Sequence, residues 1–234
     1  MPDSDLVAFL KRLSLFADLN DAAITALARV CRVRAIPKGR AIFDQGQDAD
    51  AAFIVRSGCV VVTLNTLDGR ELVINEMRAG DLFGEVALLT QSTRTATATT
   101  SQASEIIIIP RDEFLAKIAA DPNISPHIIQ TLAQRLRSSA ERESALAFQD
   151  APARLAHTLL ELDRQASAQG YVTISQEEIS QRIGITRQTT AKILGKWRRA
   201  GWIITGRGKL VILDRAALRR CALETDKPYA GEHQ

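Results

Sequence analysis

Residues 82–98, with the sequence LFGEVALLTQSTRTATA, combine residue types that suit a small phosphate ester. Gly84 lets the backbone approach a ligand closely, and the N–H groups at the start of the helical turn that follows have no intrahelical partner for hydrogen bonding. Arg94 offers a planar, permanently charged fork to phosphate oxygens. The carboxylate of Glu85 can accept a hydrogen bond from a sugar hydroxyl. The alternative is that Arg94 forms a surface salt bridge and that the glycines are ordinary turns. The occurrence of Gly84, Glu85 and Arg94 together at this spacing argues against that alternative.

This stretch resembles the phosphate-binding cassette of the cyclic-nucleotide-binding domain, whose pattern is F-G-E-x-A-L-L, a short spacer and R-[ST]-A. The resemblance implies that Glu85 binds the ribose hydroxyl and that Arg94 and Thr95 bind the cyclic phosphate. Residues 37–58 resemble the front half of the same domain. The other ligand-binding residues that the resemblance implies are Gly84, Val86, Ala96, Val62, Ile74, Arg135 and Ser139.

The identity of the purine stays open between two nucleotides. In the regulators that this chain resembles, the position of Ser139 reaches the purine, partly across a dimer axis. Those regulators often have a second hydroxyl next to it, where this chain has Ala140. In cyclic-GMP-dependent kinases a threonine at the position of Thr95 helps to bind the guanine amino group, since a hydroxyl oxygen can accept from an amine. The expected effector is cAMP, with cGMP as the second candidate.

Net charge divides the chain into two parts. Residues 1–150 hold 16 Lys and Arg against 19 Asp and Glu, a net charge of −3, whereas residues 151–234 hold 14 against 8, a net charge of +6. The segment 179–213 contains eight basic residues and no acidic one. A solvated protein face usually mixes both signs. This asymmetry indicates an anionic polymer as the partner of the C-terminal part.

Short runs with strand-like composition dominate residues 34–110, separated by glycine turns. Residues 59–64 and 71–74 flank Asp68-Gly69, a strong hairpin signal, and residues 105–109 are typical of a buried strand. A small antiparallel barrel or jelly roll follows from these runs. Helices are expected over residues 5–16, from an Asn20 cap to Val30, and over residues 112–120. We expect a first domain over residues 1–120.

Residues 121–149 are expected to form a dimerisation helix that begins at Asp121-Pro122 or Ser125-Pro126, because each pair combines a cap residue with proline. Along it, side chains recur at spacings of three and four, which is the pattern of a heptad seam. The seam contains a hydroxyl, either as a tolerated small residue or with a role in binding. Its members are Ile129, Leu132, Leu136, Ser139, Glu143 and Leu146.

Residues 150–234 show the pattern of a winged helix-turn-helix. Ser175 begins a capping box, Gly184 makes the turn, and Thr186 caps a basic second helix over residues 187–199. Residues 202–205 and 210–213 are expected to pair as a wing. Arg187 suits guanine and Gln188 suits adenine. The expected base-reading residues are Arg187, Gln188 and Lys192, and the expected phosphate contacts are Thr186, Thr189, Lys196, Arg207 and Lys209.

The two motifs in this order resemble the Crp/Fnr superfamily, on the cyclic AMP receptor protein branch, over nearly the whole chain. The resemblance implies an α+β protein, with a cyclic-nucleotide-binding β-roll (jelly-roll-like), a long dimerisation helix and a winged helix-turn-helix. It implies a homodimer that binds a two-fold symmetric operator in double-stranded DNA and contacts RNA polymerase. A cytoplasmic protein that is not inserted in a membrane is expected, because the sequence has no long apolar run and residues 1–16 lack the pattern of a signal peptide. Alternatives are a regulator that binds DNA without a cyclic nucleotide and one that senses another small ligand.

Catalysis and metal binding are not expected. The cysteines at 31, 59 and 221 and the histidines at 127, 157 and 233 are far apart in the sequence and do not have the spacing of metal ligands. No nucleophile–base arrangement appears, and both modules together leave no room for a catalytic domain. We therefore do not expect an enzyme, and we expect neither a bound metal nor a catalytic residue.

Overall fold

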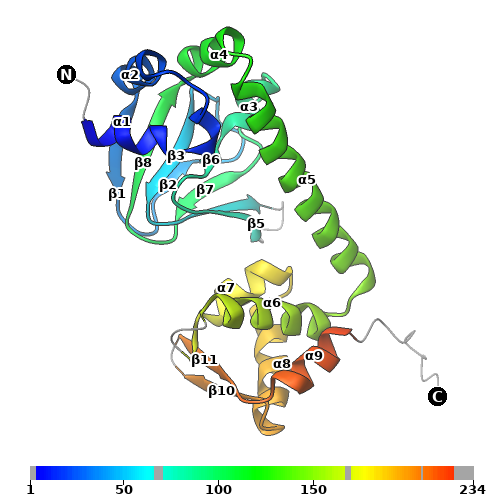
Figure 1. Cartoon of the computed structure of the whole chain (residues 1–234). Helices are drawn as coiled ribbons and strands as arrows, with labels where there is room; N and C mark the ends of the chain where they lie inside the picture. The colour runs from blue at the N-terminus through cyan, green and yellow to red at the C-terminus, as the bar shows by residue number, and fades with distance from the viewer. Residues whose placement is uncertain (1–3, 66–70, 167–169, 207, 224–234) are drawn as a thin grey trace. The chain divides into compact units, whose positions relative to one another are not determined.

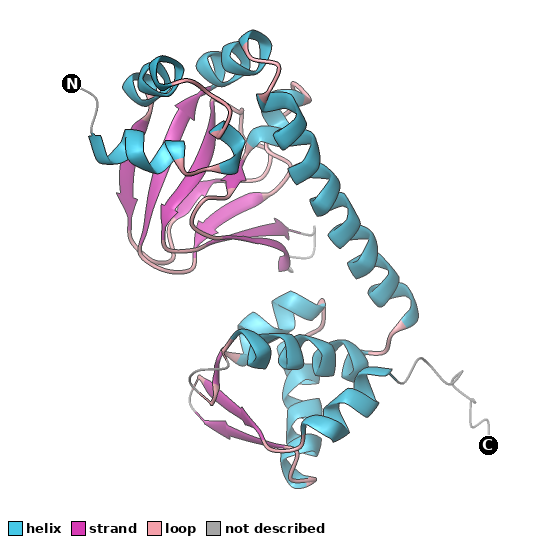
Figure 2. Ribbon diagram, in the orientation of Figure 1, coloured by secondary structure: helices cyan, strands magenta, loops and turns pink. Residues whose placement is uncertain are grey.

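A computed structural model describes residues 4–65, 71–166, 170–206 and 208–223 (Figures 1 and 2). Within the long helix, the side chains of residues 142 and 144–148 are outside this description. Contacts between residues divide the chain into two compact units, residues 1–69 with 73–137 and residues 70–72 with 138–234. The expected α+β class, with a β-rich N-terminal module and a largely helical C-terminal module, is confirmed.

Two four-stranded sheets form the centre of the N-terminal unit, in the orders β1-β8-β3-β6 and β2-β7-β4-β5. Between them lies an apolar cluster that takes Val55 and Ile106 from the first sheet and Val60 and Ala98 from the second. The strands are β1 (Arg32–Ile36), β2 (Ala41–Phe43), β3 (Ala51–Ser57), β4 (Val60–Asn65), β5 (Glu71–Met77), β6 (Leu82–Phe83), β7 (Thr97–Thr100) and β8 (Ser104–Pro110).

The strands expected from the isoleucine run and from the hairpin signal are confirmed. Ile106, Ile107 and Ile109 in β8 are fully buried, because helices cover one face of this strand while the β-roll core covers the other. Strands β4 and β5 are neighbours in their sheet, as the hairpin prediction requires. The Asp68-Gly69 turn between them lies outside the described residues.

Helices pack on the outer side of the first sheet (Figure 2). These are α1 (Ser4–Lys11), the 3₁₀ turn η1 (Ser14–Phe16), α2 (Asp21–Val30), α3 (Glu85–Leu89) and α4 (Arg111–Ala120). The single helix expected over residues 5–16 was wrong in its length, because Leu13 has extended backbone angles that separate α1 from η1. The Asn20 cap is confirmed, since its side chain accepts from the N–H of Ala23 at 2.8 Å.

The long helix α5 covers Ile124–Phe148. Neither expected cap pair marks its start. Asp121 instead accepts from the N–H of Asn123 at 3.0 Å in the turn before the helix, and Pro126 lies inside the first helical turn, where its missing N–H has no intrahelical acceptor to lose. Ile129 and Leu136 in the expected seam are 65% and 72% exposed in this single chain, so the helix has an uncovered apolar stripe.

The C-terminal unit packs helices α6 (Ala151–Gln165), α7 (Gln176–Ile183), α8 (Arg187–Arg199) and α9 (Arg215–Leu223) around buried Leu155, Leu159, Ile179 and Trp197. The wing is confirmed as β10 (Ile203–Gly206) and β11 (Lys209–Ile212). A third strand, β9 (Val172–Thr173), pairs with β11 and was not expected. No helix in the described part of the chain is long and apolar enough to cross a membrane.

Candidate functional site

Gly84 has a left-handed backbone conformation, which strongly favours glycine. It precedes α3 with φ of 76°, in the left-handed region. A Cβ atom at this position would lie 2.9 Å from Nη1 of Arg94 and 2.9 Å from a ring carbon of Phe53. Both the conformation and the close approach therefore require glycine at the start of the cassette.

Arg94 is buried, with 2% of its surface exposed. Its Nη1 donates to the carbonyl oxygen of Gly84 at 2.8 Å, and its Nη2 donates to the carbonyl oxygen of Ala51 at 2.8 Å and to Oδ1 of Asp50 at 3.2 Å. The guanidinium carbon lies 4.3 Å from the ring centroid of Phe43. Burial lowers the pKa of Arg94, and the charge of Asp50 opposes that shift. The alternative that Arg94 forms an ordinary surface salt bridge is therefore wrong.

Glu85, also buried at 1% exposure, begins helix α3. Its Oε1 accepts from Nη1 of Arg135 at 2.6 Å. Arg135 also donates to the carbonyl oxygen of Leu82 and contacts the sulfur of Met77 at 3.7 Å. Burial raises the pKa of Glu85, and the nearby charge of Arg135 opposes this shift. The structure thus brings Arg135 to Glu85, as the resemblance implied.

Two buried polar atoms of the cassette have no hydrogen-bond partner, Oε2 of Glu85 and Nε of Arg94. Buried polar atoms are almost always paired in proteins, so each unpaired one needs an explanation. One is an acceptor that suits a sugar hydroxyl, and the other is a cationic donor that suits a phosphate oxygen. These two residues therefore fit a ribose phosphate. The sequence predicted that the guanidinium fork of Arg94 binds phosphate oxygens. In the structure both terminal nitrogens of this fork already donate to protein acceptors, and Nε is the unpaired donor.

The other expected pocket residues fall into two groups. Val62 and Ala96 belong to the β-roll core, and Ile74 packs against it. Val86 and Thr95 are exposed. The described hydrogen bond of Ser139 is to Glu143 of the same helix, at 3.4 Å. Among the described residues, no group of His, Cys, Asp and Glu side chains is placed to hold a metal ion.

The helix-turn-helix follows its expected bounds closely. Ser175 and Glu178 form a reciprocal capping box, and Gly184 ends α7 with φ of 68°. Thr186 accepts from the N–H of Thr189 at 3.1 Å and so caps α8. The buried face of α8 consists of Thr190, Ile193, Leu194 and Trp197.

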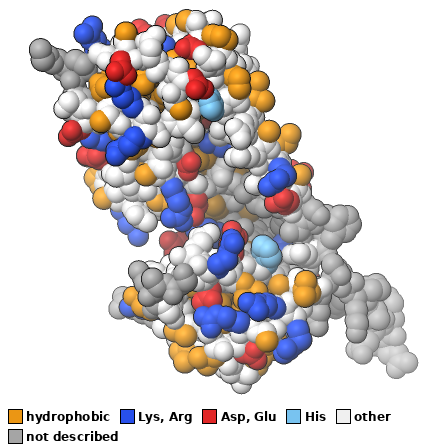
Figure 3. Space-filling model, in the orientation of Figure 1, with side chains coloured by type: hydrophobic (Ala, Val, Ile, Leu, Met, Phe, Trp, Pro, Cys, Tyr) orange, Lys and Arg blue, Asp and Glu red, His pale blue; other side chains and the backbone are white. Residues whose placement is uncertain are grey.

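The opposite face of α8 leaves its polar side chains free for a partner. The exposed residues on it are Arg187, Gln188, Lys192 and Lys196, with half-buried Thr189 beside them. Lys209 of the wing is also exposed, whereas Arg207 lies outside the described residues. Lys and Arg side chains gather on the visible face of this unit (Figure 3). The arrangement suits a negatively charged polymer.

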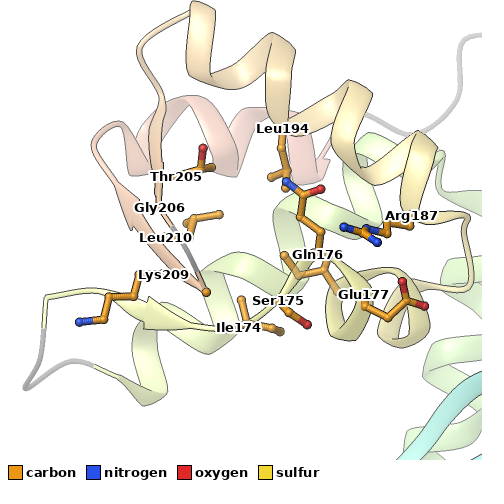
Figure 4. Close-up of a pocket in the computed structure, with 12 residues that line it drawn as sticks. Ile174, Ser175, Gln176, Glu177, Arg187, Leu194, Thr205, Gly206, Lys209 and Leu210 are labelled. Carbon is orange, nitrogen blue, oxygen red and sulfur yellow. The ribbon is translucent and has the colours of Figure 1, made fainter.

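A groove of about 420 Å³ separates the wing from the start of α7 and from α8 (Figure 4). Its floor is apolar, with Ile174, Ile179, Leu194 and Leu210, and its rim carries Gln176, Glu177, Arg187 and Lys209. In Figure 4, Lys209 lies at the opposite end from Arg187 and Glu177. Tyr171, which the sequence did not single out, lies under Lys209, with the ammonium 4.4 Å from the ring centroid.

Comparison with known proteins defines the class of both modules. Residues 33–121 match the model of the cyclic nucleotide-binding domain, and residues 153–221 match the Crp-like helix-turn-helix domain. A CRP-like cAMP-activated global transcriptional regulator of Mycobacterium tuberculosis is 32% identical over 91% of this chain and 98% of its own length. The cyclic AMP receptor protein of Thermus thermophilus is 29% identical over 91% and 98%.

A solved structure agrees with this assignment. The c-di-GMP responsive global regulator CLP of Xanthomonas campestris has a TM-score of 0.76 at 26% identity, over 83% of this chain and all of that one. The chain belongs to the Crp/Fnr family of transcription regulators. It is a DNA-binding regulator that responds to a cyclic nucleotide and not an enzyme.

Proposed function

We propose that this regulator is a cytoplasmic homodimer that binds cAMP at the Gly84–Ala96 cassette and then binds a two-fold symmetric DNA operator more tightly. The observation that carries the nucleotide site is the pair of buried, unpartnered atoms, Oε2 of Glu85 and Nε of Arg94. A cyclic nucleotide supplies both complements, a ribose hydroxyl and a cyclic phosphate. The family relatives named for activation by cAMP support the choice of nucleotide.

The second candidate effector is cGMP, favoured by one residue. Thr95 is exposed next to Arg94, and its hydroxyl can accept from the exocyclic amine of guanine or donate to phosphate. Ala140 offers no hydroxyl beside Ser139, which weakens one expected reader of adenine. We retain cAMP as the main effector and assign Thr95 and Ser139 as the residues that decide between the two purines.

Isothermal titration with cAMP and with cGMP in the same buffer tests this proposal. A third titration with c-di-GMP tests the ligand of the Xanthomonas campestris relative. Binding of cAMP is expected in the parent chain and in Arg78→Ala, a control that removes a cation with a 63% exposed side chain. Arg94→Ala is expected to lose most of the heat. Absence of heat with both cyclic mononucleotides in the folded parent chain would contradict the proposed effector.

The dimer is proposed from the apolar stripe on α5. Ile129 and Leu136 are largely exposed in the single chain, at the seven-residue spacing that coiled-coil seams use. A second copy of the same helix covers such a stripe and also brings two helix-turn-helix units to one symmetric operator. Contact with RNA polymerase belongs to the same proposal, because the family relatives are transcription regulators.

Coupling between the sites requires only differential binding. The nucleotide favours the DNA-binding state if it binds that state more tightly than the other one, and DNA must then raise nucleotide affinity by the same factor. Fluorescence anisotropy with a labelled operator, measured with and without cAMP, gives one factor. Nucleotide titration with and without the operator gives the other, and the two factors are expected to agree.

A further inference from the structure

Lys209 and Tyr171 are brought together by the third strand of the wing sheet. Lys209 begins β11, and Tyr171 directly precedes β9. The pairing of Lys209 with Thr173 and of Leu210 with Val172 fixes the register between these strands. The result is an ammonium 4.4 Å from the centroid of the tyrosine ring. Tyr171 is half-buried, whereas Lys209 is exposed, so the ring lies beneath an ammonium group that stays accessible to a partner.

We propose that Tyr171 is a positioning residue that holds the ammonium of Lys209 at the wing end of the groove, where Lys209 binds a DNA backbone phosphate. The inference rests on the proposed DNA binding and adds a residue to it. A lysine side chain loses considerable rotamer freedom when it binds one phosphate. Contact with the face of an aromatic ring reduces that freedom before DNA arrives, and such preorganisation strengthens binding.

The charges around the groove favour the wing end for the phosphate. Glu177 lines the other end together with Arg187 (Figure 4), and in the described part of the chain neither side chain has an ion-pair partner. The carboxylate of Glu177 repels a phosphate that approaches its end, whereas Arg187 can reach past it to a base edge. Lys209 has no acidic partner among the described residues to compete with a phosphate. Its remaining N–H groups are free to donate.

The test measures DNA affinity of the full chain with cAMP over a series of KCl concentrations. Two probes are used, a duplex of random sequence and a duplex selected from that pool by the protein. Lys209→Gln is expected to weaken both probes by a similar factor and to lower the salt slope by about 0.9, the change for one lost phosphate contact. An unchanged slope in Lys209→Gln would overturn the phosphate assignment.

Tyr171 is then tested against Lys209 in a double-mutant cycle. Tyr171→Leu is expected to weaken DNA binding about two- to fivefold, the range for an exposed cation–π contact, and Tyr171→Phe is expected to restore parental affinity. In the Lys209→Gln background, Tyr171→Leu is expected to have no further effect. Equal weakening in both backgrounds would show that the ring only supports the fold and would refute its positioning role.

A second variant separates the effect of the ring's charge distribution from any misfolding of Tyr171→Leu. Pentafluorophenylalanine at position 171 keeps the ring shape but removes the negative potential of its face, so it is expected to weaken DNA binding as leucine does. Parental affinity with this ring would refute the inference. If the folded parent chain with cAMP binds neither probe, the proposed cAMP-dependent DNA binding itself fails. If the parent chain binds DNA but the Tyr171 and Lys209 variants do not behave as expected, only this inference is refuted.

Discussion

Nη1 of Arg135 on the long helix α5 lies 2.6 Å from Oε1 of Glu85 on the short helix α3. This ion pair ties the cassette to the helix that carries the proposed dimer stripe. Removing one partner of a buried pair is costly because the other charge stays buried without compensation. Glu85 keeps its second carboxylate oxygen free, so ligand binding and the contact with α5 use different atoms of one side chain.

Glu85→Gln is expected to change how stability depends on pH. Burial raises the pKa of Glu85 above its usual 4.5, so the folded state binds a proton more readily than the unfolded state. The resulting stability is fully present below about pH 4.5 and is lost as the pH rises through the folded-state pKa. The parent chain should therefore lose stability relative to Glu85→Gln over that window. Urea unfolding of both proteins across the window measures it, and a constant difference would contradict the raised pKa.

Arg94→Ala is expected to weaken cAMP binding by at least about 30-fold, from ~2 kcal/mol for a charge-assisted hydrogen bond. Asp50→Asn removes only the ion pair of Nη2 with a side chain that is 89% exposed, so a loss of at most about fivefold is expected. Calorimetry measures both. Thermal unfolding must accompany it, because Arg94→Ala also leaves the buried carbonyl of Ala51 without its donor. Equal losses in the two variants would contradict these separate roles.

Leu136→Glu is expected to shift the proposed dimer toward monomers, because it places a charge in the apolar stripe of α5. Gln134→Glu adds the same charge at an exposed position on the opposite side of the helix, and it should leave the dimer intact. Sedimentation equilibrium distinguishes the two results. If both variants associate like the parent chain, the stripe is not the dimer interface.

Gln188→Glu is expected to change the preferred base at one position in each half-site. An amide pairs well with adenine, whereas a carboxylate accepts from the amino group of cytosine. The discrimination at that position should change by about 1–3 kcal/mol, and the other positions should keep their preferences. Selection from a random duplex pool measures both. A uniform loss of affinity without a new preference would assign Gln188 to the backbone instead.

Arg154→Lys is expected to reduce the effect of the nucleotide on DNA affinity. Arg154 donates to the carbonyl of Gln149 at 2.6 Å, in the connection between α5 and α6, and to the carbonyl of Ile183 at 3.2 Å, next to the turn of the helix-turn-helix. Burial lowers its pKa, and Asp150 opposes the shift. Lysine keeps the charge but cannot reproduce the planar fork. Operator affinities with and without cAMP, compared between the two proteins, measure the effect.

Local signals in the sequence placed the helix-turn-helix well. The bounds of α8 agree with the expectation, because Thr186 supplies a cap and residues 190–197 repeat with helical spacing. The capping box of α7 was equally readable, since Ser175 and Glu178 are three residues apart. Such features depend on neighbours in the chain and need no tertiary contact.

Contacts across long sequence separations could not be read in the same way. Asp50 and Ala51 meet Arg94 from more than forty positions away, and the acidic stretch before β3 does not reveal which carboxylate pairs with Arg94. Strand β9 has two residues, too few for any alternating pattern. Tyr171 was missed for that reason, because only this strand brings it under Lys209.

Gly84 constrains how this family member can vary. A side chain added there would meet Arg94 and Phe53 at 2.9 Å, whereas one added at Gly39 would meet nothing within 4 Å. Both glycines have positive φ, so a side chain would strain the backbone at either position. Only at Gly84 would it also be crowded by neighbouring atoms. In a library that samples every amino acid at both positions, Gly39 is expected to admit asparagine and aspartate, which tolerate this conformation. Position 84 is expected to return glycine alone, whichever nucleotide is used for selection.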